Sequence, residues 1–146
     1  MTDIVSSETR SRMMSGVRAK NTRPEMQIRK ALHSRGLRFR LHANALPGKP
    51  DLIFPRFRAV LLVHGCFWHG HDCQLFRWPK TNVQFWHDKI QANKVRDEAV
   101  IHALGELNWR VGTVWECAIR GSEIENVAGY VDEWLRGSDP TMEVRG

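Results

Sequence analysis

Residues 63–73 of this 146-residue chain read VHGCFWHGHDC and combine three histidines, two cysteines and two adjacent aromatic residues. A segment of this kind can bind a metal ion, or it can supply a nucleophilic thiol together with its base. It can also be the crowded end of a buried strand. The rest of the chain decides among these interpretations.

A zinc site is the interpretation that uses every cysteine of the chain. Structural Zn²⁺ is held by four Cys or His ligands in a closed tetrahedron. The spacing Cys66-x4-His71-x-Cys73 places three such ligands on one loop, and a distant strand end would bring Cys117 to them. We therefore expect a structural site that ties the loop after a central strand to the end of another strand.

Three other interpretations of these residues stay open. Asp72 could supply an oxygen ligand or a hydrogen-bond acceptor to a ligand. Cys66 could be a nucleophile activated by His64 or His69, although a thiolate bound to zinc is a poor free nucleophile. Finally, Cys66 and Cys117 could be small core residues with Cys73 incidental, and His64 and His69 could be hydrogen-bonded core residues at a strand end.

The positive charge of the chain is unevenly spread. The formal net charge is +6 and the pI is about 9.7. Ten lysines or arginines and a single acid lie between Arg10 and Arg40, whereas six acids and two bases lie from Gly121 onward. This asymmetry favours an acidic partner, most commonly nucleic acid, over a charged surface that only keeps the protein soluble.

Length and composition indicate one globular domain. A chain of 146 residues can bury about 70% of its unfolded surface. The 42% hydrophobic and 26% charged content excludes wholesale disorder, and no apolar run approaches the ~20 residues of a membrane span. The N-terminal residues lack the apolar stretch of a signal peptide, so we expect a cytoplasmic protein whose cysteines form no disulfides.

Helix and strand patterns alternate along the chain. Capping boxes at 22–25, 81–84 and 122–125 predict three helices, of which the first ends at Gly36 and the second near Leu107. Strands are predicted at 37–41, 52–54, 59–63 and 109–115. The order predicts an α/β fold in which a central mixed sheet is flanked by helices. This domain spans 22–136, between a basic arm at 1–21 and a flexible tail at 137–146.

Two acids stand at informative positions. Asp51 follows Pro50 before two successive strands, the layout of the PD-(D/E)XK nuclease fold, although the second strand lacks the acid and lysine of that fold. Asp97 lies with Asn93 on the apolar stripe of the long helix, where an unpaired carboxylate is unfavourable. Asp97 could pair with an arginine, Arg96 or Arg110, or support a catalytic histidine.

Several segments together carry a specific resemblance, which covers about Thr9 to Gly121. They are LPGKPD at 46–51, HGCFWH at 64–69, FW at 85–86, Asn93, RD at 96–97, WRV at 109–111 and VWECA at 114–118. The chain thereby resembles the very short patch repair (Vsr) DNA mismatch endonucleases. The resemblance implies a single-domain variant of the PD-(D/E)XK restriction-endonuclease-like fold, in which histidine chemistry replaces the usual acid and lysine.

The resemblance also implies roles for the polar residues. Asp51 would hold a catalytic Mg²⁺ together with the backbone carbonyl of Val63. His64 and His69 would assist the attacking water and the leaving oxygen, with Asp97 and Glu25 as supports. Glu25 also occupies the position that a capping box gives to glutamate, so a purely structural role is its alternative. The structural Zn²⁺ would be held by Cys66, His71, Cys73 and Cys117.

DNA contacts are implied in the same way. Phe67, Trp68 and Trp86 resemble an aromatic wedge that inserts beside a mispaired thymine, whereas a core position is the alternative for Phe67 and Trp68. Lys89 and Asn93 match positions that contact the T·G pair, and Met14 and Val17 match positions that reach the opposite groove. Val63, Gly70 and Asp72 depart from the common pattern of the family, which puts rate and flanking preference in doubt more than the reaction.

The sequence thus predicts a Mg²⁺-dependent endonuclease that nicks one strand 5′ to the thymine of a T·G mismatch, as arises when 5-methylcytosine deaminates. The expected partner is mismatched double-stranded DNA, with mismatch-repair proteins as further partners, and the expected state is a monomer in the bacterial cytoplasm. Two alternatives are a restriction-type endonuclease that cuts perfect duplex and a non-catalytic, zinc-stabilised DNA-binding module.

Overall fold

The computed structural model describes residues 22–42 and 45–146. The basic arm predicted at 1–21, with Met14 and Val17, lies outside the described residues. Within the described part of the chain, no helix is both long and apolar enough to cross a membrane.

One mixed sheet of five strands forms the centre of the fold, in the order β1-β2-β3-β4-β5. The strands are β1 (Arg40–Leu41), β2 (Leu52–Phe54), β3 (Ala59–His64), β4 (Arg110–Trp115) and β5 (Thr141–Val144). The pairs β1–β2 and β2–β3 are antiparallel, whereas β3–β4 and β4–β5 are parallel. The predicted α/β fold with a central mixed sheet is confirmed.

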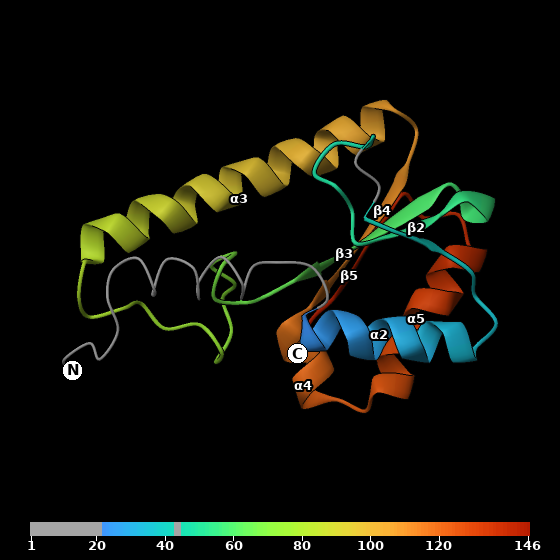
Figure 1. The fold of residues 1–146 in the computed structure, drawn as a ribbon, viewed down its shortest axis with the longest axis horizontal. Helices are drawn as coiled ribbons and strands as arrows, with labels where there is room; N and C mark the ends of the chain where they lie inside the picture. The colour runs from blue at the N-terminus through green and yellow to red at the C-terminus, as the bar shows by residue number, and fades with distance from the viewer. Residues whose placement is uncertain (1–21, 43–44) are drawn as a thin grey trace.

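Helices cover both faces of this sheet (Figure 1). On one face lie α2 (Arg23–Ser34), α4 (Glu116–Gly121) and α5 (Ile124–Arg136), and on the other lies the long α3 (Val83–Glu106). A short 3₁₀ helix, η1 (Pro55–Phe57), joins β2 to β3. Helix α4 was not predicted from the sequence.

Alternation along the strands sorts the core into two layers. Ala59 and Leu61 of β3 belong to the larger layer, with α2 and α5, whereas Val60 and Leu62 belong to the smaller layer under the C-terminal half of α3. Successive side chains of a strand point to opposite faces, so a strand with apolar residues at every position serves both layers.

Helix α2 starts as its sequence predicts. Thr22 caps it in an extended conformation, and its hydroxyl oxygen accepts a hydrogen bond from the Glu25 amide at 3.4 Å. Gly36, with a φ of +85°, turns the chain after the helix. Ile28, Ala31 and Leu32 are buried on the face that packs against the sheet.

Helix α3 differs at its start from the prediction. Its N-cap is Asn82, in a left-handed conformation with no capping side-chain bond, so the capping box expected from Thr81 is wrong. The helix has 24 residues, or about 36 Å, and its N-terminal half runs past the edge of the sheet (Figure 1). That half is free to carry residues for a site rather than for the core.

The end of the chain is a strand, and the flexible tail predicted for 137–146 is wrong. Strand β5 pairs in parallel with β4, and the amide of Val111 donates to the carbonyl of Pro140 at 2.9 Å. Met142 and Val144 alternate with exposed residues and pack against the larger core layer. The strand predicted at 37–41 is also shorter than expected, because Leu37 turns into the core beside α2 instead.

Candidate functional site

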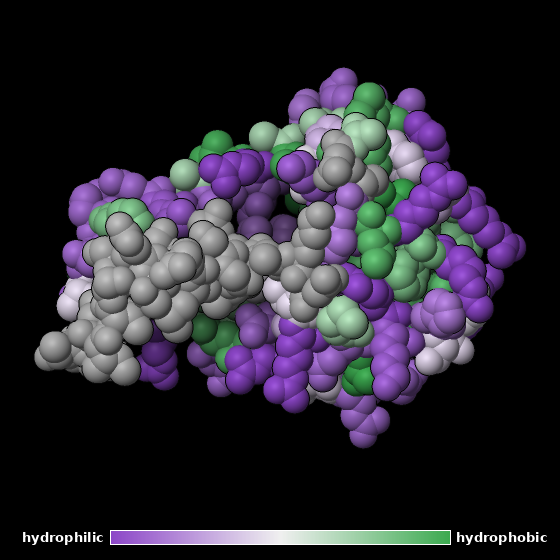
Figure 2. Space-filling view, viewed as in Figure 1, coloured by the Kyte–Doolittle hydropathy of each residue, from purple (hydrophilic) through white to green (hydrophobic). Residues whose placement is uncertain are grey.

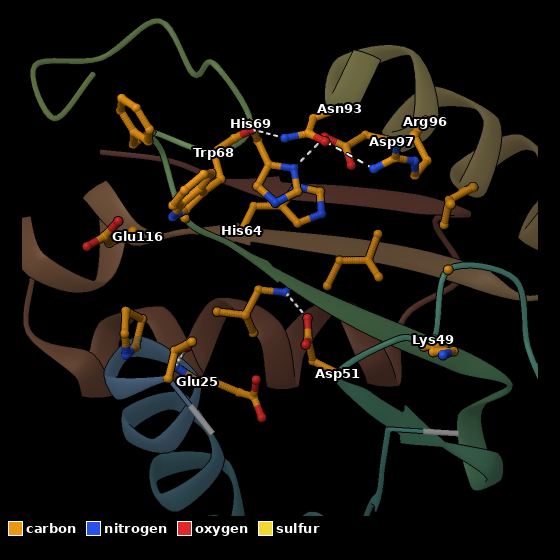
Figure 3. Close-up of a pocket in the computed structure, with 18 of the residues that line it drawn as sticks. Glu25, Lys49, Asp51, His64, Trp68, His69, Asn93, Arg96, Asp97 and Glu116 are labelled. Atoms are coloured by element: carbon orange, nitrogen blue, oxygen red, sulfur yellow. Dashed lines mark hydrogen bonds and ion pairs between the residues drawn. The ribbon is translucent and has the colours of Figure 1, made fainter. Parts of the chain in front are cut away.

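A pocket of about 900 Å³ opens where β3 ends. It is lined by the start of α2, the end of β3, the loop after β3 and the middle of α3. Figure 2 shows a hollow on this face of the molecule, beside α3, with hydrophilic residues at its edge. In the close-up of Figure 3, Glu25 and Asp51 lie on one side of the β3 ribbon and the histidines lie on the other.

Asp51 lies at the junction of β2 with the pocket. Its Oδ2 accepts a hydrogen bond of 2.7 Å from the amide of Val63, so the structure brings together the two residues that the resemblance assigns to one cation. Burial raises the pKa of Asp51 to about 7, the Val63 bond opposes this rise, and the negative charge of Glu25 adds to it. A buried carboxyl next to a second acid is an environment that a bound cation would stabilise.

Glu25 is itself only 3% exposed. Its Oε2 is ion-paired with Arg29, one turn along α2, and lies 2.9 Å from Nε2 of His42. Glu25 therefore combines the capping-box position with a place beside Asp51, and the two interpretations of this residue do not exclude each other. His42 was missed from the sequence, where nothing around it indicates a site.

The two pocket histidines form a stacked pair. The ring centroids of His64 and His69 lie 3.9 Å apart with nearly parallel planes. His69 Nδ1 lies 2.5 Å from Oδ2 of Asp97, so Asp97 pairs with a histidine and not with Arg96 or Arg110. Burial, with a further contribution from the charge of His69, lowers the pKa of His64 to about 3, so His64 is neutral at physiological pH.

Asn93 fixes the loop after β3 to α3. Its Nδ2 donates to the carbonyl of Trp68 at 2.8 Å, and its Oδ1 accepts from Arg96 at 3.0 Å. Gly70, whose φ is +59°, allows the same loop to lie close to α3. A Cβ at this residue would lie only 2.6 Å from the side chain of Ile90. The Asn93 amide is thus occupied within the protein, and its predicted contact with DNA stays a prediction, as does that of the half-buried Lys89.

The three predicted wedge aromatics form one cluster. Phe67 lies 5.1 Å from Trp68 and 5.3 Å from Trp86, and the two tryptophans lie 5.8 Å apart, measured between ring centroids. Phe67 and Trp68 are half-buried, and Trp86 is buried. The cluster therefore lies between a core position and a free surface, beside the pocket that Phe67 and Trp68 help to line.

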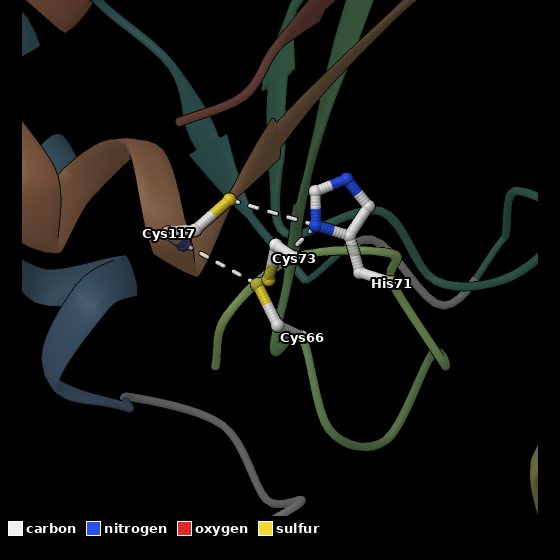
Figure 4. Close-up of side chains that lie close together, drawn as sticks. All are labelled: Cys66, His71, Cys73 and Cys117. Atoms are coloured by element: carbon white, nitrogen blue, oxygen red, sulfur yellow. Dashed lines mark hydrogen bonds between the residues drawn. The ribbon is translucent and has the colours of Figure 1, made fainter. Parts of the chain in front are cut away.

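The four predicted zinc ligands converge (Figure 4). The ligand atoms of Cys66, His71, Cys73 and Cys117 all lie within 4.8 Å of one another, so the group could hold a metal ion. Nδ1 of His71 is the nitrogen that faces the thiols, at 3.6 Å from Cys66 and 3.5 Å from Cys117. Burial raises the pKa of the Cys66 thiol, which a bound cation would lower.

Parallel pairing of β3 with β4 explains this convergence. His64 is the register partner of Trp115, so Cys66 and Cys117, two residues further along each strand, leave the sheet side by side. The backbone amide of Cys117 donates to Sγ of Cys66 at 3.3 Å. Asp72, the alternative ligand, is instead 84% exposed, and its carboxylate is ion-paired with Arg145.

Trp115, the last residue of β4, lies between the two groups. Its ring stacks on His71 at 3.9 Å and meets the edge of His64 at 5.1 Å. One side chain thus contacts a member of the cysteine cluster and a histidine of the pocket.

Fold and pocket together define a mixed α/β protein in which acids and histidines meet at strand ends, next to a separate cysteine cluster. The family model for the DNA mismatch endonuclease Vsr matches residues 2–75. The chain belongs to the Vsr family, and it is accordingly a DNA endonuclease.

Relatives extend the match over the whole chain. The DNA mismatch endonuclease Vsr of Escherichia coli is 40% identical over 147 aligned residues, which cover 99% of this chain and 94% of that protein. The type II nicking enzyme V.XorIIP of Xanthomonas oryzae is 52% identical over 119 residues, 82% of this chain and 88% of that enzyme. The type II nicking enzyme V.NaeI of Lentzea aerocolonigenes is 36% identical over 142 residues, 92% of this chain and 83% of that enzyme.

Proposed function

We propose that this protein nicks one DNA strand 5′ to the thymine of a T·G mismatch, by Mg²⁺-dependent phosphodiester hydrolysis in very short patch repair. The observation that carries the proposal is the meeting of Asp51 with the His64–His69–Asp97 group in one pocket, beside an aromatic cluster. The names of two relatives specify nicking and that of a third specifies mismatch cleavage, which supports a single-strand cut at a mismatch.

The acidic side of the pocket fits a hard cation. Asp51 and the backbone carbonyl of Val63 would hold Mg²⁺, and oxygen donors are the ligands that this ion prefers. When bound, the ion would neutralise charge on the phosphate and lower the pKa of a bound water. The Asp51 carboxyl must be ionised for this role, and its raised pKa makes that requirement pH-dependent.

The histidine side of the pocket fits proton transfer. Asp97 accepts the hydrogen of His69 Nδ1, which leaves Nε2 as the nitrogen that can take a proton from the attacking water. Neutral His64 still has one N–H to donate, and we assign that hydrogen bond to the leaving oxygen. Glu25 would support the arrangement from the acidic side.

The aromatic cluster fits recognition of a weak base pair. Phe67, Trp68 and Trp86 would insert beside the mispaired thymine. Unstacking a base step costs a few kcal/mol and costs least at a mismatch, so insertion itself favours mismatched sites. Lys89 and Asn93 would contact the T·G pair from α3, which requires the Asn93 amide to exchange its present bonds for bonds to the bases. Met14 and Val17, in the basic arm, would reach the opposite groove.

The cysteine cluster fits structural zinc. Three thiols and one imidazole nitrogen are the donor set of closed tetrahedral zinc sites, and the group contains no carboxylate. Zn²⁺ held by Cys66, His71, Cys73 and Cys117 would fix the loop that carries Phe67, Trp68 and His69. We also propose that the protein acts as a monomer, because one asymmetric mismatch needs no two-fold symmetry. We propose the bacterial cytoplasm as its location and mismatch-repair proteins as its partners.

Cleavage of end-labelled duplexes that differ at one base pair tests this function. Wild-type protein and the Asp51→Ala variant would be incubated with T·G and C·G duplexes, in Mg²⁺ and in EDTA. We expect a nick only in the thymine strand of the T·G duplex, and only with Mg²⁺ and Asp51 present. Equal cutting of the C·G duplex would make the protein a restriction-type endonuclease and would overturn the proposed substrate.

A further inference from the structure

His42, which has no part in the proposed chemistry, belongs to a third group of side chains that could bind a metal ion. The ligand atoms of Glu25, His42 and Asp51 lie within 4.8 Å of one another. His42 also lines the pocket, and its side chain is 12% exposed. None of the roles assigned above involves His42.

The side chain of His42 binds one particular oxygen of Glu25. Its Nε2 lies 2.9 Å from Glu25 Oε2, the same oxygen that is ion-paired with Arg29. Nε2 also lies 3.3 Å from a terminal nitrogen of Arg29. A guanidinium can only donate and a carboxylate can only accept, so the shorter contact assigns the hydrogen to Nε2 and makes His42 a donor to Glu25.

The backbone of His42 is tied to the other acid. Its amide donates to the carbonyl of Asp51 at 3.3 Å, and its φ is +45°, a left-handed conformation. Residues other than glycine adopt this conformation uncommonly, and the hydrogen bond to Asp51 helps to hold His42 in it. His42 therefore joins the main chain at Asp51 to the side chain of Glu25.

We propose that His42 is a positioning residue that, with Arg29, holds Glu25 by Oε2 and so leaves Oε1 for the cation site at Asp51. This inference rests on the proposed function, because it assigns the cation to that site. The proximity of the two acids agrees with a shared site, because one carboxylate oxygen of each lies within 4.8 Å of the other and of a ring nitrogen of His42.

Binding of Mn²⁺, as a probe of the Mg²⁺ site, tests the inference without DNA. Titrations followed by electron paramagnetic resonance would compare wild-type protein with His42→Ala and His42→Gln. Residues that orient a metal ligand typically change metal affinity about 10–100-fold, so we expect His42→Ala to weaken Mn²⁺ binding at least about tenfold. The Gln variant should retain most of the affinity, because its amide N–H reaches about as far as Nε2–H.

Two controls separate positioning from folding. His102 is exposed, and its Nε2 lies 3.3 Å from Oε1 of Glu106, so His102→Ala changes a histidine of α3 away from the pocket and should leave Mn²⁺ affinity unchanged. Thermal unfolding in EDTA shows whether each variant is folded. Should His42→Ala unfold, the Gln variant carries the test, and its Mn²⁺ affinity must then stay near that of the wild type.

Unchanged Mn²⁺ affinity in a folded His42→Ala variant would overturn the inference. Equal losses in the Ala and Gln variants would also overturn it, because the hydrogen bond would then not be the cause. The proposed function fails by a different result, namely wild-type protein that does not nick the T·G duplex. Mn²⁺ binding that depends on Asp51 and on His42 would support the inference in either case.

Discussion

The cysteine cluster and the acid–histidine pocket grow from the same strand ends but differ in nearly every physical respect. The cluster consists of sulfur and nitrogen donors, and three of its four residues, Cys66, His71 and Cys117, are buried. The pocket is open and holds about 900 Å³, with Glu25 and Asp51 on one side and His64, His69 and Asp97 on the other. One region can saturate a metal ion with protein ligands, whereas the other has room for a substrate.

One short segment contributes residues to both regions. The end of β3 and the loop after it place His64 and His69 in the pocket and Cys66, His71 and Cys73 in the cluster. A metal ion bound in the cluster would therefore fix the segment that carries the pocket histidines. Trp115 lies between the two regions, stacked on His71 and in edge contact with His64. We infer that the cluster stabilises the structure and that the pocket carries out the cleavage reaction.

Loss of one cluster ligand should have the largest effect. We expect Cys117→Ser to lose the zinc and to lower the free energy of unfolding by several kcal/mol, because structural zinc contributes about 10–16 kcal/mol in small zinc-finger domains. Zinc content and urea unfolding would measure this. Asp72→Asn is the matched control in the same loop, and zinc loss in that variant would break the assignment of the four ligands.

Loss of His69, the proposed base, should slow cleavage strongly and spare the cluster. His69→Ala removes the group that Asp97 orients, and a general base contributes about 10²–10⁴-fold to rate, so single-turnover cleavage should fall by that factor. Zinc content should be unchanged, which distinguishes the two regions. His87→Ala, an exposed histidine of α3, should retain activity, and zinc loss from His69→Ala would contradict the separation.

The pocket should also govern how stability depends on pH in metal-free protein. The pKa of Asp51 rises from 3.8 to about 7, so the folded state binds more protons between these values and its stability falls as pH rises. The pKa of His64 falls from 6.5 to about 3, so its contribution is lost as pH falls from 6.5 to about 3. These two dependences oppose each other and nearly cancel between about pH 4 and 6.5.

A variant isolates the Asp51 dependence. As pH rises from about 4 to 7, the wild type should lose stability relative to Asp51→Asn. The loss in unfolding free energy should reach up to about 1.4 kcal/mol per pH unit. Urea unfolding at several pH values in EDTA measures it. A difference that does not change with pH would show that Asp51 titrates normally, and the contrast between pocket and cluster would lose its electrostatic part.

The smallest effect is expected at the rim of the cluster. Arg145, next to β5, is ion-paired with Asp72 at 2.8 Å and also donates to its carbonyl, but both side chains are exposed, and exposed pairs contribute little. We expect Arg145→Ala to speed zinc removal by a chelator a few-fold at most and to leave cleavage unchanged. Complete zinc loss would show that β5 closes the cluster, a larger role than the geometry indicates.

The sequence predicted the elements whose signals are local. The face of Ile28, Ala31 and Leu32 follows the helical period, and the apolar run of β3 is long enough to indicate burial on both sides. Strand β5 was missed because its residues, TMEV, are weakly apolar and its pairing with β4 is non-local. The capping box predicted at Thr81 was wrong, because the N-cap of α3 is Asn82 and no side chain caps the helix there.

The candidate site divides in the same way. The four cluster residues could be identified because cysteines are few and their spacing is informative. For Asp97, the sequence left open whether its partner is an arginine or a histidine. The partner depends on how the loop after β3 packs on α3, which the sequence does not show. His42 and Trp115 could not be identified, because each acquires its place only when α2, β3 and β4 come together.

Metal content measured alongside cleavage tests whether the cluster binds zinc for structure while the pocket requires Mg²⁺ for cleavage. Protein would be dialysed against EDTA, analysed for zinc by atomic emission, and assayed on the T·G duplex before and after Mg²⁺ is returned. We predict that zinc stays at one per chain, that nicking stops in EDTA, and that Mg²⁺ alone restores it. Full nicking without Mg²⁺, or activity that follows the zinc content and not Mg²⁺, would contradict a structural role for the cluster and a catalytic role for the pocket.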